Sequence, residues 1–147
     1  MIKLVNGEPV EMTAEEVAEF EASRTESLDA KKARIWEKIK AFRDDRVENG
    51  GFKVGAHWYH SNVLSRTQYI SLVMMGANIP AGTTWKTLDN GYVPMTQTLA
   101  GQIFAAGAAQ DAALFAKAAE HRAAMEASSD PESYDWSTGW PESYTGA

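Results

Sequence analysis

The sequence predicts a mainly helical α+β protein. Long N- and C-terminal helices and a central helix accompany two short β-hairpins that form a small antiparallel sheet. Three observations support this class: apolar residues recur with helical spacing through 28–47, thirteen of residues 100–127 are alanine, and tight-turn pairs separate short extended segments at two places. With 147 residues, 44% of them hydrophobic, the chain is long enough for one compact domain with extensions.

Residues 1–12 are expected to form a strand or hairpin arm that turns at Asn6-Gly7. A helical segment over 13–48 follows. Thr13 and Glu16 have the spacing of a capping box, and the helical pattern weakens around 23–27. The pattern therefore leaves open whether this segment is one long helix or two helices.

Charge is unevenly distributed along this helical segment. Residues 11–29 hold seven acids against one base, and residues 31–46 hold seven bases against three acids. Blocks of opposite charge can pair within a chain or between copies, although two solvated faces are the simpler interpretation. The net charge of −6 argues against a general nucleic-acid-binding protein.

Residues 49–127 are expected to form a compact α+β domain. Asn49-Gly50-Gly51 should end the preceding helix, and Gly55-Ala56 suits the turn of a hairpin over 52–60. We expect Ser61 to cap a helix over 62–75. Its apolar residues cover more than half of its circumference, which predicts a central, buried helix.

A second hairpin and a long helix complete this domain. Asp89-Asn90-Gly91 is a strong hairpin-turn signal, because asparagine and glycine tolerate positive φ. Pro94 cannot donate a ladder hydrogen bond and therefore indicates an edge strand. Thr96 is expected to cap a helix that extends to about Ala127.

The tail over 128–147 has a different composition. The tetrapeptide Pro-Glu-Ser-Tyr occurs at 131–134 and again at 141–144, with Trp136 and Trp140 between the copies. Such a segment cannot form its own core, so it either docks on a neighbouring protein or folds back on its own domain. Large aromatics are common at interface hot spots. The predicted partner-binding residues are Trp136, Trp140, Tyr134 and Tyr144 in the tail, with Trp36, Ile39 and Phe42 as a second surface.

The residues give no pattern typical of a catalytic, cofactor or metal site. There is no cysteine, and the histidines at 57 and 60 should point to opposite faces of a strand. We therefore expect no enzyme activity, no cofactor and no metal. Neither a signal peptide nor a membrane span is indicated, which suggests a protein kept in the cytoplasm unless a particle carries it out.

One region resembles a known family. Its matching features are turns and helix starts: Arg43-Asp44, Gly51, Phe52, Val54, His60-Ser61, Arg66, Trp85, Asp89-Asn90-Gly91, Val93, Thr96 and a long final helix with His121. In these features Arg43–Ala127 resembles a domain of unknown function that is common in tail fibre and tail-fibre-assembly proteins of tailed bacteriophages and prophages. The resemblance carries over no active-site residue.

The resemblance implies a structural component of a bacteriophage tail, at the fibre or the baseplate, that mediates protein–protein assembly. Its expected partners are other phage tail proteins and further copies of itself, with no nucleic acid and no membrane. Its expected location is the virion tail, and the host cytoplasm during assembly. The alternative is a tail-fibre assembly chaperone that is not retained in the virion. A small cell-wall-degrading accessory enzyme, and a glycan-binding module that uses Trp58, Tyr59 and Trp85, are further hypotheses.

Overall fold

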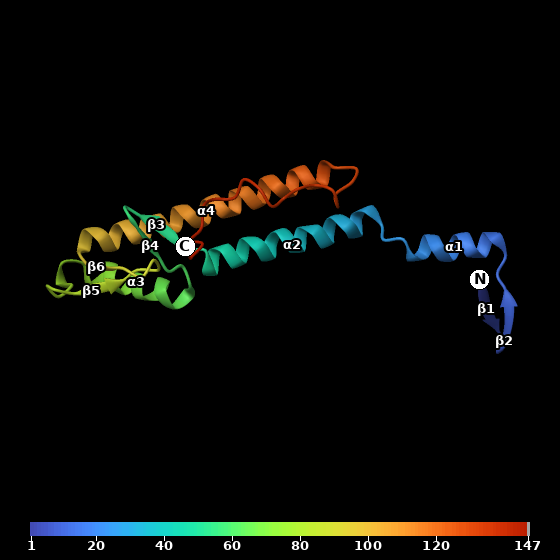
Figure 1. Ribbon diagram of the computed structural model, residues 1–147, viewed down its shortest axis with the longest axis horizontal. Helices are drawn as coiled ribbons and strands as arrows, with labels where there is room; N and C mark the ends of the chain where they lie inside the picture. The colour runs from blue at the N-terminus through green and yellow to red at the C-terminus, as the bar shows by residue number, and fades with distance from the viewer. Residues whose placement is uncertain (147) are drawn as a thin grey trace.

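The computed structural model describes residues 1–146 and confirms the α+β class. The molecule is elongated, with an N-terminal arm projecting from one end of a helical body (Figure 1). The arm comprises strands β1 (Ile2–Val5) and β2 (Glu8–Glu11) and helix α1 (Ala14–Arg24). Helix α2 (Leu28–Asn49) begins the body.

Two hairpins and two helices complete the body. In chain order these are β3 (Phe52–Val54), β4 (His57–Tyr59), α3 (Val63–Met75), the short 3-10 turn η1 (Gly76–Asn78), β5 (Thr84–Lys86), β6 (Tyr92–Pro94) and α4 (Gln97–Ala127). Within residues 1–146 the strands form three separate two-stranded antiparallel sheets. The expected merging of the two body hairpins into one sheet is therefore wrong, although the backbone N–H of Leu88 still donates to the carbonyl of Trp58 at 2.7 Å.

The body is built on two long helices that run in opposite directions, α2 and α4 (Figure 1). Along one half of α4, Ile35 and Ile39 of α2 pack against Ala118 and Met125. The branched side chains of α2 meet a helix whose alanines allow close approach. This cluster forms the first part of the core.

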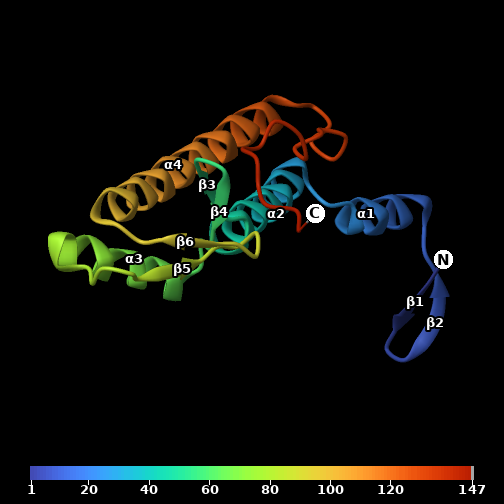
Figure 2. The same cartoon turned by 60° about the vertical axis from the view of Figure 1, so that its left-hand side comes forward.

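The second part of the core lies at the other half of α4, where α3 and the hairpins pack (Figure 2). Its buried members are Phe52, Tyr59, Tyr69, Leu72, Met95, Ala100 and Ile103. Phe52 lies directly on the backbone of α4 at Gly107, where an added Cβ would be 3.3 Å from the ring. The absence of a side chain at Gly107 thus lets β3 approach the helix.

The segment 13–48 forms two helices rather than one. The Thr13 side chain accepts from the N–H of Glu16, and the Glu16 carboxylate accepts from the N–H of Thr13, so the capping box is confirmed. Thr25 leaves helical geometry with a ψ of 120°. Ser27 then caps α2 by accepting a hydrogen bond from the N–H of Ala30. The serine, with its strong capping preference, explains where the second helix begins.

The prediction that Ser61 caps α3 is wrong by one residue. Asn62, not Ser61, accepts from the N–H of Ser65 at 2.8 Å. The buried Ser61 hydroxyl instead accepts from the N–H of Gly51 at 2.9 Å and donates to the carbonyl of Glu48 at 3.1 Å. The Ser61 hydroxyl thus provides hydrogen-bond partners for two backbone groups at the point where the chain leaves α2.

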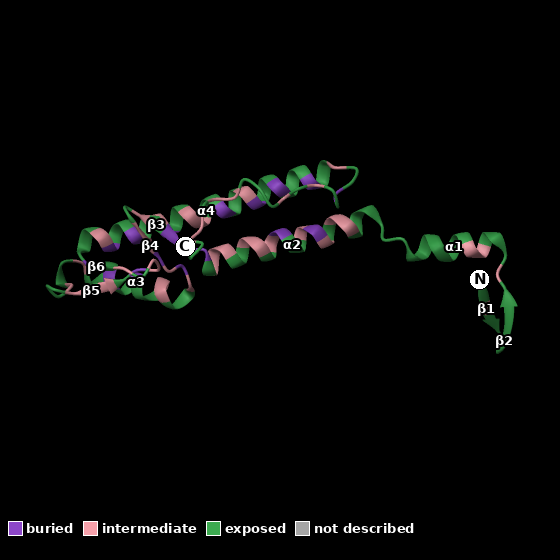
Figure 3. Ribbon diagram, viewed as in Figure 1, coloured by how far each residue is buried: buried purple, intermediate pink, exposed green. Residues whose placement is uncertain are grey.

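The prediction that α3 is central and buried is wrong. Only Tyr69 and Leu72 of this helix are buried, whereas Leu64 is 70% exposed and Met74 81% exposed (Figure 3). The helix packs one side against α4 and leaves the other side in solvent. Its broad apolar circumference therefore produces an exposed apolar surface, not a second buried face.

The turns follow the sequence signals. Asn6, Gly55 and Asn90 have φ values of 53°, 59° and 60°, in the left-handed region that each hairpin turn requires. Pro94 is the last residue of β6, which pairs with β5 in a two-stranded sheet. The predicted turns and the edge position of Pro94 are thus confirmed.

Candidate interaction surfaces

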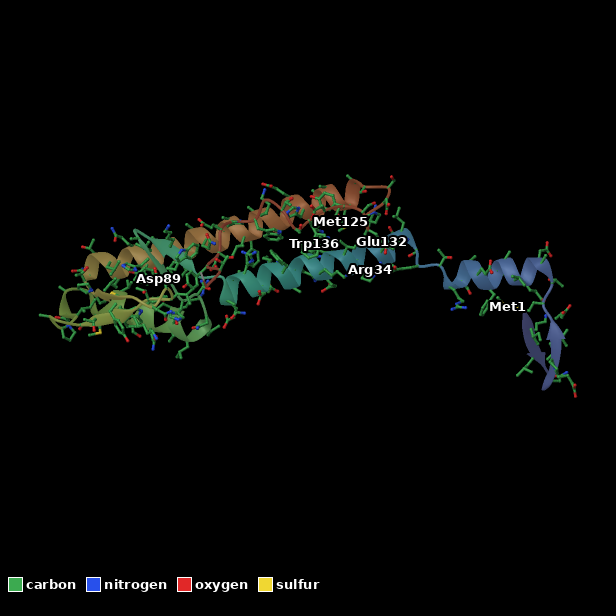
Figure 4. All side chains as sticks on the ribbon, viewed as in Figure 1. Met1, Arg34, Asp89, Met125, Glu132 and Trp136 are labelled. Carbon is green, nitrogen blue, oxygen red and sulfur yellow. The ribbon has the colours of Figure 1, made fainter. Side chains whose placement is uncertain are left out.

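The aromatic tail folds back on its own body. The rings of Trp136 and Trp140 lie 5.7 and 4.9 Å from the ring of Phe42, measured between centroids. The indole N–H of Trp140 donates to the carbonyl of Trp136 at 2.7 Å. Figure 4 shows Trp136 between the two long helices, near Met125. Of the two alternatives for the tail, folding back is the one observed.

The buried His121 of α4 connects the tail to the body. Its ring is 6% exposed, and its Nε2 lies 2.8 Å from the carbonyl oxygen of Thr138. A carbonyl can only accept, so Nε2 donates to Thr138, and Nδ1 lies 2.8 Å from the Tyr134 hydroxyl oxygen. The ring also lies 5.1 Å from the ring of Trp140. Both histidine nitrogens are therefore satisfied by the tail.

Ion pairs hold the start of the tail against α2. The Glu132 carboxylate contacts Arg34 at 2.6 Å and Lys31 at 3.0 Å, and Arg34 also binds Glu26 at 2.9 Å (Figure 4). Hydrogen bonds from Arg34 and then Lys31 lower the pKa of Glu132, and the hydrogen bond from Arg34 lowers the pKa of Glu26. Arg34 thus links the tail to the segment between α1 and α2.

The end of the tail is fixed at the first hairpin. The backbone N–H of Tyr144 donates to the carbonyl of Gly50 at 2.9 Å, and its ring lies 6.1 Å from the ring of Trp58. The Gln110 side chain donates to the carbonyl of Glu142 at 2.9 Å. The tail therefore follows the helix pair from the end of α4 back to the end of α2.

The structure brings the predicted partner-binding residues together within one chain. Trp36, Tyr134, Trp136 and Trp140 are partly buried around the Ile35–Met125 cluster, and Phe42 lies under the two tail tryptophans. Tyr144 lies apart, at the hairpin. Ile39 is 0% exposed, so its assignment to a partner surface is wrong in this conformation. For the other six residues, the assignment to a partner stays a prediction.

Arg66 joins three helices, and sequence reasoning did not assign it this role. Its guanidinium contacts Asp111 of α4 through Nη1 at 2.6 Å and Nη2 at 2.8 Å. It also donates to the carbonyls of Val47, at 3.2 Å, and Ser61. A cleft of about 200 Å³ opens beside it, lined in part by Ile70 and Phe104. The Arg66–Asp111 pair could not be predicted from the spacing of charged residues, because the two residues are 45 positions apart.

Asp89 organises the contact between the two body hairpins. Its carboxylate accepts from the backbone N–H of Trp58 at 3.3 Å and lies 3.2 Å from Nδ1 of His57. A hydrogen bond from Thr87 and the contact with His57 lower the pKa of Asp89. Because Tyr59 is only 1% exposed, the glycan-binding hypothesis loses one of its three aromatic residues.

The arm differs from the body in how little of it is buried. Helix α1 buries no residue, and Leu4 and Phe20 are 74% and 41% exposed. An ion pair between Lys3 and Glu16 fastens the hairpin to α1. The arm is thus internally ordered, but apolar side chains such as Leu4 and Phe20 stay exposed.

No group of histidine, cysteine, aspartate or glutamate side chains that could hold a metal ion occurs within residues 1–146. Over the same residues, none of the helices has both the length and the apolar character needed to cross a membrane.

Residues 30–138 match a protein family described as a domain of unknown function (DUF4376). The match covers α2 from Ala30 on, both body hairpins, α3, α4 and the tail as far as Thr138. Neither a curated protein nor a solved structure matches the chain.

Proposed function

We propose, on the premise that this chain belongs to the DUF4376 family, that it is a structural component of a bacteriophage tail. It would be a small subunit of the fibre or baseplate that is present in several copies and binds other tail proteins. The support is the resemblance of Arg43–Ala127 to domains common in tail fibre and tail-fibre-assembly proteins. The proposal assigns the chain no catalytic step.

The observation that carries this proposal is the contrast between the arm and the body. Leu4 and Phe20 are largely exposed, although the arm around them is ordered by β-pairing and a capping box. Exposed apolar side chains on an ordered projection favour burial against another protein. The body, by contrast, has satisfied its polar groups: no buried side-chain nitrogen or oxygen within residues 1–146 lacks a hydrogen-bond partner. A rigid body with an unburied arm is suited to assembly.

The tail adds rigidity to that body. Because Trp136 and Trp140 cover Phe42 and the helix pair, the tail fixes the spacing of α2 and α4. In this proposal the tail is a brace, and the arm makes the principal contact of assembly.

The test is quantitative mass spectrometry of purified particles of the source phage. We expect the chain in the particles, at a fixed copy number relative to the major tail protein. Presence in the infected-cell lysate with absence from the particles would overturn the proposal and favour the assembly-chaperone alternative. Absence from both fractions, with the gene transcribed, would overturn both.

A further inference from the structure

Helix α1 presents acidic side chains that have no ion-pair partner within residues 1–146. Glu15, Glu19 and Glu21 make no salt bridge in this part of the chain. Phe20 is 41% exposed, and the Arg24 guanidinium lies 5.5 Å from its ring centroid. An acidic helix with an exposed aromatic ring is complementary to a basic surface that contains aromatic rings. The chain itself contains a surface that combines cations with aromatic rings.

That surface is a groove of about 400 Å³ between α2 and α4, lined by Asp29, Lys32, Ala33, Trp36, Arg122 and Glu126. The Arg122 guanidinium lies 4.8 Å from the centroid of the Trp36 ring, and the Lys40 ammonium lies 5.7 Å from it. No tail residue lines this groove among the residues described. It is therefore open to an incoming helix.

The cationic surface continues along α2 beyond the groove. Arg43 lies 4.2 Å from the ring centroid of Phe115, which is 52% exposed. The surface thus combines two aromatic rings with four cations, Lys32, Lys40, Arg43 and Arg122. Lys40 is paired with Glu37 at 2.6 Å and Arg43 with Asp44 at 2.7 Å, both on α2 itself. Asp29 and Glu126 are the two acids in the groove lining, and Glu126 is bound to Arg122 at 2.8 Å. Lys32 has no ion-pair partner within residues 1–146.

The dimensions of the two surfaces match. Helix α1 has 11 residues, which corresponds to roughly 16 Å of helix. The distance along α2 from Lys32 to Arg43 is also roughly 16 Å at the same rise per residue. One helix lying along the groove could therefore reach all four cations.

The hinge directs α1 away from its own groove. Glu26, between α1 and α2, accepts hydrogen bonds from Nε and Nη2 of Arg34 at 3.0 and 2.9 Å. Arg34 is in turn held by Glu132 of the tail at 2.6 Å. With the hinge fixed in this way, the arm projects from the end of the body (Figure 1).

We infer that α1 docks in the α2–α4 groove of a second copy of this chain. Reciprocal docking of both arms gives a closed two-fold dimer. The acids of each α1 meet the cations around Trp36 of the other copy, and Phe20 covers exposed aromatic surface there. The inference deepens the proposed function by naming a partner surface. It is tested on the purified chain alone, so it can fail while the proposed role in the phage tail stands.

The first experiment measures molar mass by sedimentation equilibrium over a wide range of protein concentration. We expect the full chain to reach twice its mass of 16.1 kDa and the chain lacking residues 1–25 to stay monomeric. Added salt should weaken the dimer, because exposed charge pairs are screened. A full chain that is monomeric at every concentration, or a dimer that persists without the arm, would overturn the inference.

A charge exchange tests the pairing itself. The double variants Glu19→Lys/Glu21→Lys and Lys32→Glu/Arg122→Glu should each weaken self-association by about tenfold or more. Mixed together, the two variants should form a heterodimer. The matched control Lys38→Glu/Lys86→Glu makes the same change in net charge at exposed positions outside the groove lining, and it should dimerise like the unaltered chain. Failure of the mixture to associate, with both variants folded, would contradict the arm–groove contact.

Discussion

At the scale of the residue, Gly51 determines how the chain leaves α2. Its φ is +67°, and a Cβ built there would lie 2.6 Å from Cδ2 of Leu88 and 3.0 Å from the carbonyl oxygen of Tyr59. Both the backbone conformation and the lack of space require glycine. The sequence indicated a glycine-dependent helix end here, but the contact with Leu88, 37 positions further along, depends on the tertiary fold.

This reasoning predicts opposite outcomes for two glycines. Gly51→Ala should lower the free energy of unfolding by about 2 kcal/mol or more, because a left-handed conformation and a steric clash are combined. Gly101→Ala, within α4 and with nothing near its Cβ position, should raise it by about 0.5–1 kcal/mol. Urea unfolding monitored by circular dichroism measures both. A Gly51→Ala chain as stable as the unaltered one would contradict the description of this turn.

Arg66 gives the second prediction at this scale. Arg66→Met keeps much of the apolar stem but leaves Asp111 and two backbone carbonyls without their donor. We expect a loss of about 1–3 kcal/mol in the free energy of unfolding. Arg24→Met, at an exposed site in the arm, is the control and should change it by less than about 0.5 kcal/mol. Equal effects of the two substitutions would show that the Arg66 network does not stabilise the body.

At the scale of the element, the tail and α3 mark how far the sequence could predict the structure. Helix starts were predictable because Thr13 and Thr96 have local capping partners, and hairpins because Asn6 and Asn90 tolerate positive φ. The burial of α3 was not predictable, because an apolar side chain such as Met74 does not reveal whether a second layer covers it. The tail showed the need for a partner surface, but only the fold reveals that this surface is its own α2 and α4.

The tail's ion pairs predict a pH effect. The pKa of Glu132 is held below its ordinary value of 4.5 by Arg34 and Lys31. A carboxyl with a lowered pKa in the folded state stabilises at pH values above its unfolded pKa. This contribution is lost as the pH falls from 4.5 through the lower, folded value. We expect the stability difference between the unaltered chain and Glu132→Gln to be largest at neutral pH and to shrink over this acidic range.

The measurement is the midpoint of urea unfolding as a function of pH. Tryptophan fluorescence monitors the unfolding, since Trp136 and Trp140 report on the packing of the tail. Glu142→Gln is the control, because Glu142 makes no ion pair within residues 1–146. A midpoint difference for Glu132→Gln that stays constant from neutral to acidic pH would contradict the role of these ion pairs.

At the scale of the whole molecule, the arm and the body are structurally independent. Apart from the Glu26–Arg34 pair at the hinge, the ion pairs within residues 1–146 lie either within the arm or within the body. Removing residues 1–25 should therefore leave the unfolding midpoint of the body unchanged within about 0.5 kcal/mol in stability. A large loss of stability in calorimetry or urea unfolding would show that the arm belongs to the folded core.

The sequence contained the opposite charge blocks over 11–29 and 31–46, and it left open whether they pair within one chain or between copies. The break at Thr25–Ser27 explains why the sequence alone could not distinguish pairing within one chain from pairing between copies. The two blocks lie on separate helices, and the segment between the helices contacts Arg34, which also binds the distant Glu132. A contact between residues 98 positions apart leaves no periodicity in the sequence.

The most direct test of the central claim, that this chain assembles into a phage tail through its arm, compares two chains in purified particles. Phages lacking the gene are complemented with either the full chain or the chain lacking residues 1–25, and both are quantified in the particles by mass spectrometry. The account predicts stoichiometric incorporation of the full chain and little or none of the truncated chain, although the truncated chain is folded in the lysate. Equal incorporation of the two chains would contradict the assignment of the arm as the assembly element.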